Sequence, residues 1–327
     1  MPCFSPLDAW QPLPNNPVGA TKLVFGTPSN PWYKPIKVGC DQCIGCRLDY
    51  SRQWAVRCSH EAHMYGHDNE FITLTYDNDH LPDDLSLQKE DFQNFMKRFR
   101  KHFSYTGVHD VVDPKTGKIS RPIRYYHCGE YGDRFARPHY HACLFNIRLP
   151  DRKPFKVING VPLFTSDILR KIWGKGHVST GNVTFESAAY VARYMTKKVK
   201  GKNADAHYGE SYDLETGEVF LARQPEYCTM SLKPGLGRTF YEKYKDDIYT
   251  LDKCIIRGGI KCSPPRYYDN LYKAENPDHW REIEEKRVAN MEKHAENNSQ
   301  ARLKTRERVL LRRIENLKRT FETGETK

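Results

Sequence analysis

The sequence predicts an α+β fold in which helices flank a central antiparallel sheet, and three observations support this prediction. The chain has 327 residues, which is enough to bury a substantial core. Between about residues 70 and 200, segments that alternate every second residue and segments with helical spacing follow one another in the order strand, helix, strand, strand, helix, strand, helix. The two adjacent strands are joined only by DRFARP, which is short enough for a hairpin and therefore makes them antiparallel.

The N-terminal part of the chain predicts an arm, a helix and the first strand of this sheet. Residues 1–39 are rich in proline, asparagine and glycine, which indicates an extended arm without periodic structure. A helix is expected over residues 47–63, where apolar residues recur among polar ones. In FITLTY, residues 71–76, apolar side chains alternate with threonines, a pattern typical of a strand with one buried face.

The next segments predict a helix and then the hairpin. Ser86 is expected to cap a helix that runs to about residue 103, because phenylalanines and a methionine recur there at spacings of three and four. Strands are expected over residues 123–132 and 139–147 on either side of the hairpin loop.

The second half of the chain predicts fewer strands and more helix. A short helix is expected over residues 164–173, a strand over 176–185 and a helix over 186–200. Residues 201–270 are rich in glycine, proline and tyrosine and show few periodic runs. From about residue 278 to residue 321 the chain is charged and helical in pattern.

These elements predict three parts of the chain. Residues 1–66 contain the arm, a cysteine cluster and a helix. Residues 67–270 would form the sheet domain, and residues 271–327 a basic helical tail.

The charge and the cysteine content limit the class of protein. Lysine and arginine number 52 against 41 aspartates and glutamates, so the net charge is +11 and a polyanionic partner is expected. The mean hydropathy of −0.77 and the lack of a long apolar run argue against a membrane span and a membrane partner. Ten cysteines in a chain of this length, with no secretory signal, are expected to be reduced, some of them as metal ligands.

The pattern His139-Tyr140-His141 predicts a metal site. Residues two apart in a strand point to the same side, so both imidazoles could share one ion. Glu130 on the preceding strand would lie opposite or diagonal to them, and Asp133 in the loop is an alternative third ligand. The other interpretation is a half-exposed strand whose histidines face solvent.

Tyr190 and Tyr194 form the second candidate group. Residues four apart share one face of a helix, and Lys197 and Lys198 lie about one turn further along. A phenol is a poor nucleophile near neutral pH unless a cation lowers the cost of ionising it, and the lysines or a metal could do so. The alternative is a helix that packs two aromatic rings into the core.

The third candidate group is Cys40, Cys43 and Cys46. Three thiolates at this spacing can hold one Zn²⁺ with a fourth ligand from elsewhere in the chain. Cys3 is the first candidate for the fourth ligand because the arm could fold back, and Cys58 and His60 are alternatives. Three reduced cysteines at a buried turn are the other interpretation.

Three segments together resemble the HUH endonuclease superfamily and, within it, the replication initiators of small single-stranded DNA phages of the microvirus type. They are FITLTYD at 71–77, GEYGDRFARPHYHACLF at 129–145 and AAYVARYMTKK at 188–198. The last is the most specific, because many initiators and transposases of this superfamily carry one tyrosine and this sequence carries two. The opening MPC, CDQCIGC and RQWAVRC are also similar to the N-terminal part of these phage proteins.

The resemblance implies an HUH endonuclease fold for residues 67–270 and a function in rolling-circle replication. Glu130, His139 and His141 would hold Mg²⁺ or Mn²⁺. Tyr190 or Tyr194 would attack the DNA and form a 5′-phosphotyrosyl link. Tyr194 is the first candidate for the initiating residue because it lies nearer Lys198, and Tyr190 is the alternative. Lys198 or Lys197 would offset charge at the phosphate.

The implied partners are single-stranded DNA and duplex replicative-form DNA at the phage origin, together with host helicase and polymerase, in the cytoplasm of the bacterial host. The rival hypothesis is a non-catalytic nucleic-acid-binding zinc protein in which the tyrosines stack on bases.

Overall fold

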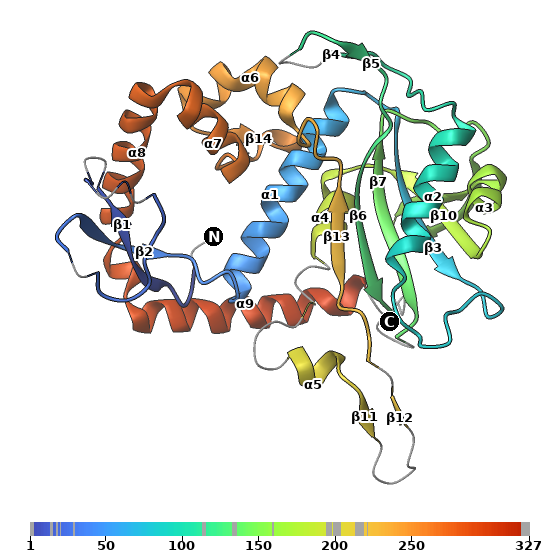
Figure 1. Cartoon of the computed structure of the whole chain (residues 1–327), viewed down its shortest axis with the longest axis horizontal. Helices are drawn as coiled ribbons and strands as arrows, with labels where there is room; N and C mark the ends of the chain where they lie inside the picture. Colours follow the sequence, from blue (N-terminus) through green and yellow to red (C-terminus); the bar gives the residue numbers. More distant parts are fainter. Residues whose placement is uncertain are drawn as a thin grey trace. The chain divides into compact units, whose positions relative to one another are not determined.

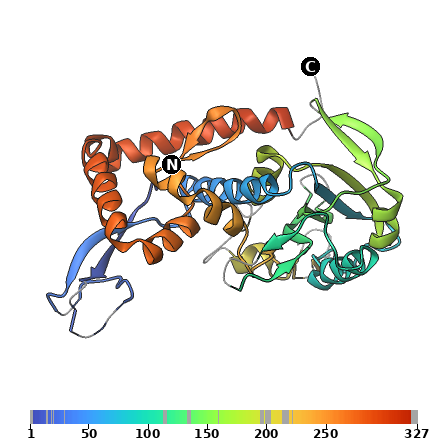
Figure 2. The same cartoon turned by 90° about the horizontal axis from the view of Figure 1, so that it is seen from above.

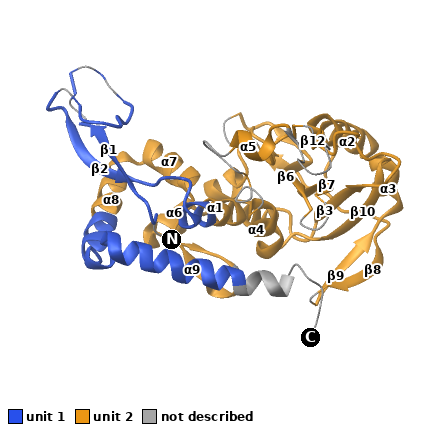
Figure 3. Cartoon of the chain, turned by 90° about the horizontal axis from the view of Figure 1, so that it is seen from below, with its two compact units in different colours: residues 1–49, 286–327 blue, residues 50–285 orange. Residues whose placement is uncertain are grey.

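The structure is a computed structural model of the chain. It describes residues 3–13, 16–17, 19, 21–28, 30–112, 116–132, 136–158, 160–193, 198, 204–212, 219–220 and 222–321. The chain divides into two compact units, residues 50–285 and residues 1–49 with 286–327 (Figure 3). The predicted division at residues 66 and 270 stays a prediction.

The larger unit, residues 50–285, contains one extended sheet. Its strands run in the spatial order β13-β6-β7-β3-β10-β9-β8, and each paired neighbour is antiparallel. The strands of this sheet are β3 (Asn69–Tyr76), β6 (Arg124–Tyr131), β7 (Pro138–Phe145), β8 (Lys153–Ile158), β9 (Val161–Thr165), β10 (Gly176–Asn182) and β13 (Tyr227–Met230).

Helices and short strand pairs complete the larger unit. The helices are α1 (Ile44–His63, which begins in the other unit), α2 (Lys89–His102), α3 (Asp167–Trp173), α4 (Phe185–Arg193), α5 (Ala204–Tyr208), α6 (Arg238–Leu251), α7 (Arg266–Glu275) and most of α8 (Pro277–Glu292). The short strands are β4 (Val111–Val112), β5 (Ile119–Ser120), β11 (Ser211–Tyr212), β12 (Val219–Phe220), β14 (Cys254–Ile255) and β15 (Lys261–Cys262), with a 3₁₀ turn at Arg257–Gly259.

The two faces of the sheet are covered by different helices, because successive side chains of a strand point to opposite sides. On one face, Leu74 of β3 and Tyr140 of β7 pack against α2 and α3 in one apolar core. On the other face, Cys143 of β7 packs with Ala55 of α1 and Val191 of α4 in a second core. Figure 1 shows this layered arrangement, and Figure 2 shows the same elements from above. The α+β fold with an antiparallel sheet flanked by helices is therefore confirmed.

Several predicted boundaries are wrong, and each has a local cause. Ser86 does not cap α2, because the helix begins at Lys89 and the Ser86 hydroxyl instead accepts the backbone N–H of Gln224 at 2.8 Å. The helix expected over 164–173 begins only at Asp167, because the Ser166 hydroxyl accepts the Leu169 N–H and caps it there.

Other elements were not predicted at all. Residues 1–39 contain a strand pair rather than only an extended arm. Strands β8 and β9 are not expected from the sequence, because every residue of β8 is exposed and no residue of β9 is fully buried. In the region with few periodic runs, α6 buries tyrosines, whose hydroxyls donate to carboxylates: Tyr241 to Glu275 at 2.9 Å and Tyr249 to Asp269 at 3.0 Å.

The helical tail is two helices rather than one. Helix α8 ends at Glu292, and α9 (Gln300–Phe321) follows a 3₁₀ turn at Glu296–Asn298. Asparagine and serine compete with the helix backbone for hydrogen bonds, and Asn297, Asn298 and Ser299 stand together at this break. None of the helices within the described ranges carries an apolar stretch of the length that a bilayer crossing requires.

The smaller unit has its own strand pair. Strand β1 (Leu7–Pro12) runs antiparallel to β2 (Tyr33–Val38), with Leu7 opposite Val38 at one end. The unit also contains α9, whose Leu303 is buried and whose arginines 302, 308, 312 and 313 are exposed.

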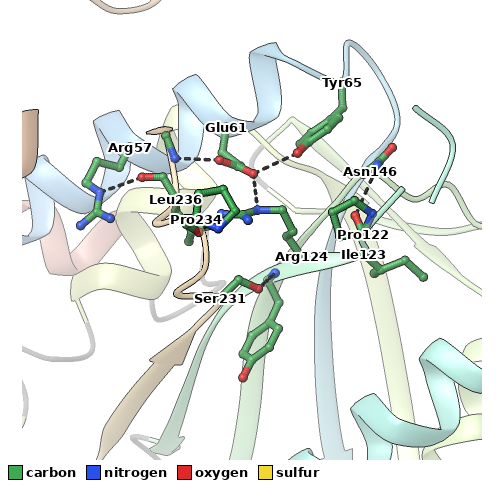
Figure 4. Close-up of polar contacts among 12 residues, drawn as sticks. Arg57, Glu61, Tyr65, Pro122, Ile123, Arg124, Asn146, Ser231, Pro234 and Leu236 are labelled. Carbon is green, nitrogen blue, oxygen red and sulfur yellow. Dashed lines mark hydrogen bonds and ion pairs between the residues drawn. The ribbon is translucent and has the colours of Figure 1, made fainter. Parts of the chain in front are cut away.

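A buried ion pair attaches α1 to the sheet. The Arg124 Nε lies 2.6 Å from Glu61 Oε1, and both side chains are almost inaccessible, at 4% and 2% exposure. Glu61 also accepts hydrogen bonds from the Tyr65 hydroxyl and from the Gly237 N–H, at 3.1 and 2.7 Å. Arg124 donates to the Pro234 carbonyl at 2.7 Å, so the pair joins α1, β6 and the segment before α6 (Figure 4).

Replacing Arg124 with methionine is expected to destabilise the protein strongly. The substitution keeps most of the volume but leaves the Glu61 carboxylate buried without its cation, which typically costs about 3–5 kcal/mol. Arg121→Ala is the control, because the Arg121–Asp110 pair is exposed and water and salt screen it. Urea unfolding should separate the two variants, and equal midpoints would contradict a structural role for the buried pair.

Candidate active site

The hairpin of β6 and β7 places a carboxylate beside two imidazoles. In the register of the pair, Glu130 stands directly opposite His139, and Cys128 stands opposite His141. Alternation then puts Glu130, His139 and His141 on the face of the sheet that α4 covers, since Cys143 of the same face packs in that core. The pairing of β6 with β7 therefore brings these three side chains together.

The three side chains are in direct contact. Glu130 Oε1 lies 2.7 Å from Nε2 of His139 and 3.0 Å from Nε2 of His141. Their ligand atoms form one group within 4.8 Å of one another. Two imidazole nitrogens and a carboxylate oxygen form a donor set that suits a divalent ion with open coordination positions.

The outer nitrogen of each imidazole is fixed by a partner on the other side of the ring. His139 Nδ1 lies 3.0 Å from the Arg137 carbonyl, and His141 Nδ1 lies 2.9 Å from the Thr73 hydroxyl. A carbonyl oxygen only accepts, so Nδ1 of His139 carries a proton, and Nε2 of the same ring faces Glu130. Such outer contacts fix the ring orientation that a metal ligand requires.

Glu130 is ionised at neutral pH. Its side chain is 2% exposed, and burial by itself raises the pKa of this carboxyl. The hydrogen bonds from His139 and His141, with their positive charge, outweigh that effect and hold the pKa of Glu130 at about 2. The carboxylate is therefore present as an anionic donor across the physiological range.

Helix α4 places Tyr190 beside this group. The helix starts immediately after β10, because the Thr184 and Ser187 hydroxyls accept each other's backbone N–H at 3.1 and 2.8 Å. The Tyr190 ring lies 5.2 Å from the His141 ring, centroid to centroid and nearly perpendicular to it, and 6.3 Å from the Phe71 ring. Tyr190 remains 37% exposed, so it stands at the edge of the buried group formed by the glutamate and the two histidines.

The remaining candidates on this helix and loop are only partly placed. Tyr194, Lys197 and Asp133 lie outside the described residues, as does most of the predicted helix beyond Arg193. Lys198 is described and is half-buried. The catalytic and metal-binding roles of all these residues stay predictions.

Thr73 and Arg137 are site residues that lie within the quoted motifs but have no role predicted from the sequence. Thr73 lies opposite His141 in the pairing of β3 with β7, and the alternation of FITLTY already puts its hydroxyl on that face. Arg137 donates to the Tyr76 carbonyl at 3.0 Å and to the Asn78 amide oxygen at 2.7 Å. These bonds hold Arg137 in place, and with it the backbone carbonyl that contacts His139. No sequence pattern marks a residue that acts through its backbone.

The cysteine cluster forms a second group in the smaller unit. The sulfurs of Cys3, Cys40, Cys43 and Cys46 lie within 4.8 Å of one another. The two other candidates for a fourth ligand lie in other surroundings. Cys58 is buried in the core beneath α4, and His60 stacks on Phe240 with its Nδ1 3.1 Å from the Tyr268 hydroxyl.

Comparison with known proteins finds relatives among phages. The family model described as replication-associated protein ORF2/G2P matches residues 69–199. The replication-associated protein VP4 of Bdellovibrio phage phiMH2K is 36% identical over 249 residues, which are 76% of this chain and 71% of the relative. The replication-associated protein ORF2 of Spiroplasma virus 4 is 33% identical over 249 residues, 74% of this chain and 69% of the relative.

A more distant relative is the replication-associated protein ORF4 of Chlamydia phage 1, 26% identical over 237 residues, which are 71% of this chain and 52% of the relative. No solved structure matches the chain. The family match covers the strands and the helix that carry Glu130, the two histidines and Tyr190.

Proposed function

Because the chain belongs to the family of phage replication-associated proteins of the ORF2/G2P type, we propose that it initiates rolling-circle replication by nicking one strand of phage DNA. The observation that carries the proposal is the position of the Tyr190 ring, 5.2 Å from a histidine of a two-histidine, one-glutamate group. A nucleophile beside a divalent-ion site is the arrangement that phosphodiester transfer requires.

The proposed fold is that of an HUH endonuclease. The two histidines lie on β7, which is flanked by β6 and β3 inside the sheet, and the tyrosine helix α4 covers the same face. Strands would then lie under the proposed metal ligands and a short helix over them, an arrangement that favours precise positioning of reacting groups.

The proposed ligands of Mg²⁺ or Mn²⁺ are Glu130, His139 and His141, because their donor atoms lie within 4.8 Å of one another. In addition, Nδ1 of each histidine already has a hydrogen-bonding partner that orients the ring. The bound ion would polarise the scissile phosphate as a Lewis acid. Glu130 would supply negative charge to the site, and the two imidazoles would bind the ion as neutral ligands through Nε2.

The proposed chemical step is an in-line displacement by a tyrosine. The Tyr190 oxygen forms a bond to phosphorus as its proton departs to water, and the bond from phosphorus to the 3′ oxygen breaks. The 3′ oxygen takes up a proton, which leaves a 3′-hydroxyl for a polymerase and a 5′-phosphotyrosyl link. Lys198 would offset negative charge near the phosphate.

The second tyrosine, Tyr194, would attack phosphorus at the newly made junction and release a 3′-hydroxyl there. That 3′-hydroxyl would attack phosphorus of the first phosphotyrosyl link, which closes the displaced strand and releases Tyr190 with its proton restored. In the proposal the net charge of +11 holds the DNA backbone, both as single strand and as duplex at the origin. Host helicase and polymerase would then act on the exposed strand and the 3′-hydroxyl.

The test uses the circular supercoiled duplex of the phage genome that encodes the protein. With Mn²⁺, the expected product is a nicked circle with the protein attached to the 5′ end, and chelation should abolish it. The competing function, a zinc protein that binds nucleic acid without cutting it, is favoured by the cysteine cluster. That function predicts salt-dependent binding and an intact circle at every metal concentration.

Thr73→Val is expected to weaken metal binding about 10–100-fold, the usual effect of removing the outer partner of a metal-ligating histidine. Valine keeps the shape of the side chain but cannot hydrogen-bond to Nδ1 of His141. The half-saturating Mn²⁺ concentration for nicking should rise, while the rate at saturating Mn²⁺ changes little.

Thr75→Val is the matched control for this positioning role. Thr75 lies on the same face of β3, opposite His139, whose ring nitrogens contact Arg137 and Glu130 instead. Equal Mn²⁺ dependence of the two variants would show that Thr73 does not position His141.

A further inference from the structure

The four clustered sulfurs are spaced as a single tetrahedral ion would space them. The sulfur of Cys3 lies 3.5 Å from that of Cys40 and 3.9 Å from that of Cys43. Four thiolates bound to Zn²⁺ at about 2.3 Å in a tetrahedron stand about 3.8 Å apart. A disulfide would need about 2.05 Å, and all ten cysteines of the chain are free.

Backbone amides surround these sulfurs as donors. The N–H of Phe4 donates to the sulfur of Cys43, the N–H of Cys40 to that of Cys3, and the N–H of Cys43 to that of Cys40, each at 3.3 Å. Hydrogen bonds of this kind stabilise thiolates and orient them toward a shared ion.

We propose that Cys3, Cys40, Cys43 and Cys46 bind one structural Zn²⁺. Four protein ligands leave no open position, so the site is closed and has no part in the DNA chemistry proposed above. A four-iron cluster binds each cysteine to a separate iron at the corner of a cube, which requires wider sulfur spacing than the cluster shows.

The position of the cluster in the chain indicates what the ion stabilises. Strand β1 begins at Leu7, four residues after Cys3, and β2 ends at Val38, two residues before Cys40. Leu7 and Val38 are opposite each other, so the ion closes the open end of this strand pair. A strand pair on its own is at best marginally stable in water, and a metal staple is a common remedy.

The test measures metal in full-length protein purified under reducing conditions without a metal-affinity step. Elemental analysis should find about one zinc per chain, and Cys3→Ser should lose most of it. Cys262→Ser is the control, since Cys262 lies in β15 and not in the cluster. Cys3→His can still ligate zinc and should retain the metal. Its zinc content therefore shows whether the loss in Cys3→Ser comes from the missing ligand or from misfolding.

Loss of zinc should also make the strand pair of β1 and β2 more accessible to a protease. Limited proteolysis is expected to cut within residues 7–38 at least tenfold faster in Cys3→Ser than in Cys3→His. Absence of metal from reduced protein, iron in place of zinc, or full zinc content in Cys3→Ser would each overturn the proposal. None of these measurements involves DNA, so their outcome is independent of whether the protein nicks.

Discussion

The His141→Ala variant is expected to lose DNA nicking by about 10³-fold or more, because removal of one of the three proposed ligands would cost several kcal/mol of metal-derived stabilisation. His141 is nearly buried, its Nε2 contacts Glu130 and its ring faces Tyr190. The loss therefore affects both the metal and the position of the tyrosine. A gel assay of supercoiled phage DNA with Mn²⁺ measures it directly.

DNA binding by this variant should change little, because the net charge that attracts the backbone remains. His102→Ala is the control, since it removes an exposed imidazole at the end of α2. Undiminished nicking by a His139→Ala, His141→Ala double variant would remove the metal site from the proposed mechanism.

The Tyr190→Phe, Tyr194→Phe double variant is expected to form no covalent DNA adduct. Phenylalanine keeps the ring and its contacts with His141 and Phe71 but lacks the attacking oxygen. Each single variant should retain some nicking, because the other phenol can reach a phosphate in a separate transfer. Denaturing gels of labelled DNA detect the adduct, and peptide mapping identifies the tyrosine that carries it.

Tyr105→Phe provides the control for loss of a phenol, because Tyr105 is 64% exposed in the turn after α2. A double variant that still produces a protein-linked 5′ end, or a wild-type adduct on neither Tyr190 nor Tyr194, would contradict the two-tyrosine mechanism.

The predictions from sequence succeeded where a periodic pattern coincides with burial. FITLTY alternates because Ile72 and Leu74 are fully buried on one face, and the helix of phenylalanines is buried through Phe95 and Phe99. The hairpin was predictable from the length of its loop, and with it the approach of Glu130 to His139.

The predictions failed where the buried side chains carry polar groups or where few side chains are buried. Tyr241 and Tyr249 of α6 are buried, but their hydroxyls donate to Glu275 and Asp269, so hydrophobicity alone does not reveal the helix. Every residue of β8 is exposed and no residue of β9 is fully buried, so neither strand has a buried face to impose alternation. Ser86 is a good capping residue by type, yet a tertiary contact with Gln224 uses its hydroxyl.

The short connection between β10 and α4 restricts how this part of the chain can vary in length. Only Val183 and Thr184 separate the last residue of the strand from the first residue of the helix, and the reciprocal bonds of Thr184 and Ser187 fix that start. One inserted residue would rotate every later helical side chain by about 100°. Tyr190 would then turn away from His141, so insertions and deletions at this junction are incompatible with the site. The exposed edge strand β8, by contrast, can change length without moving the site.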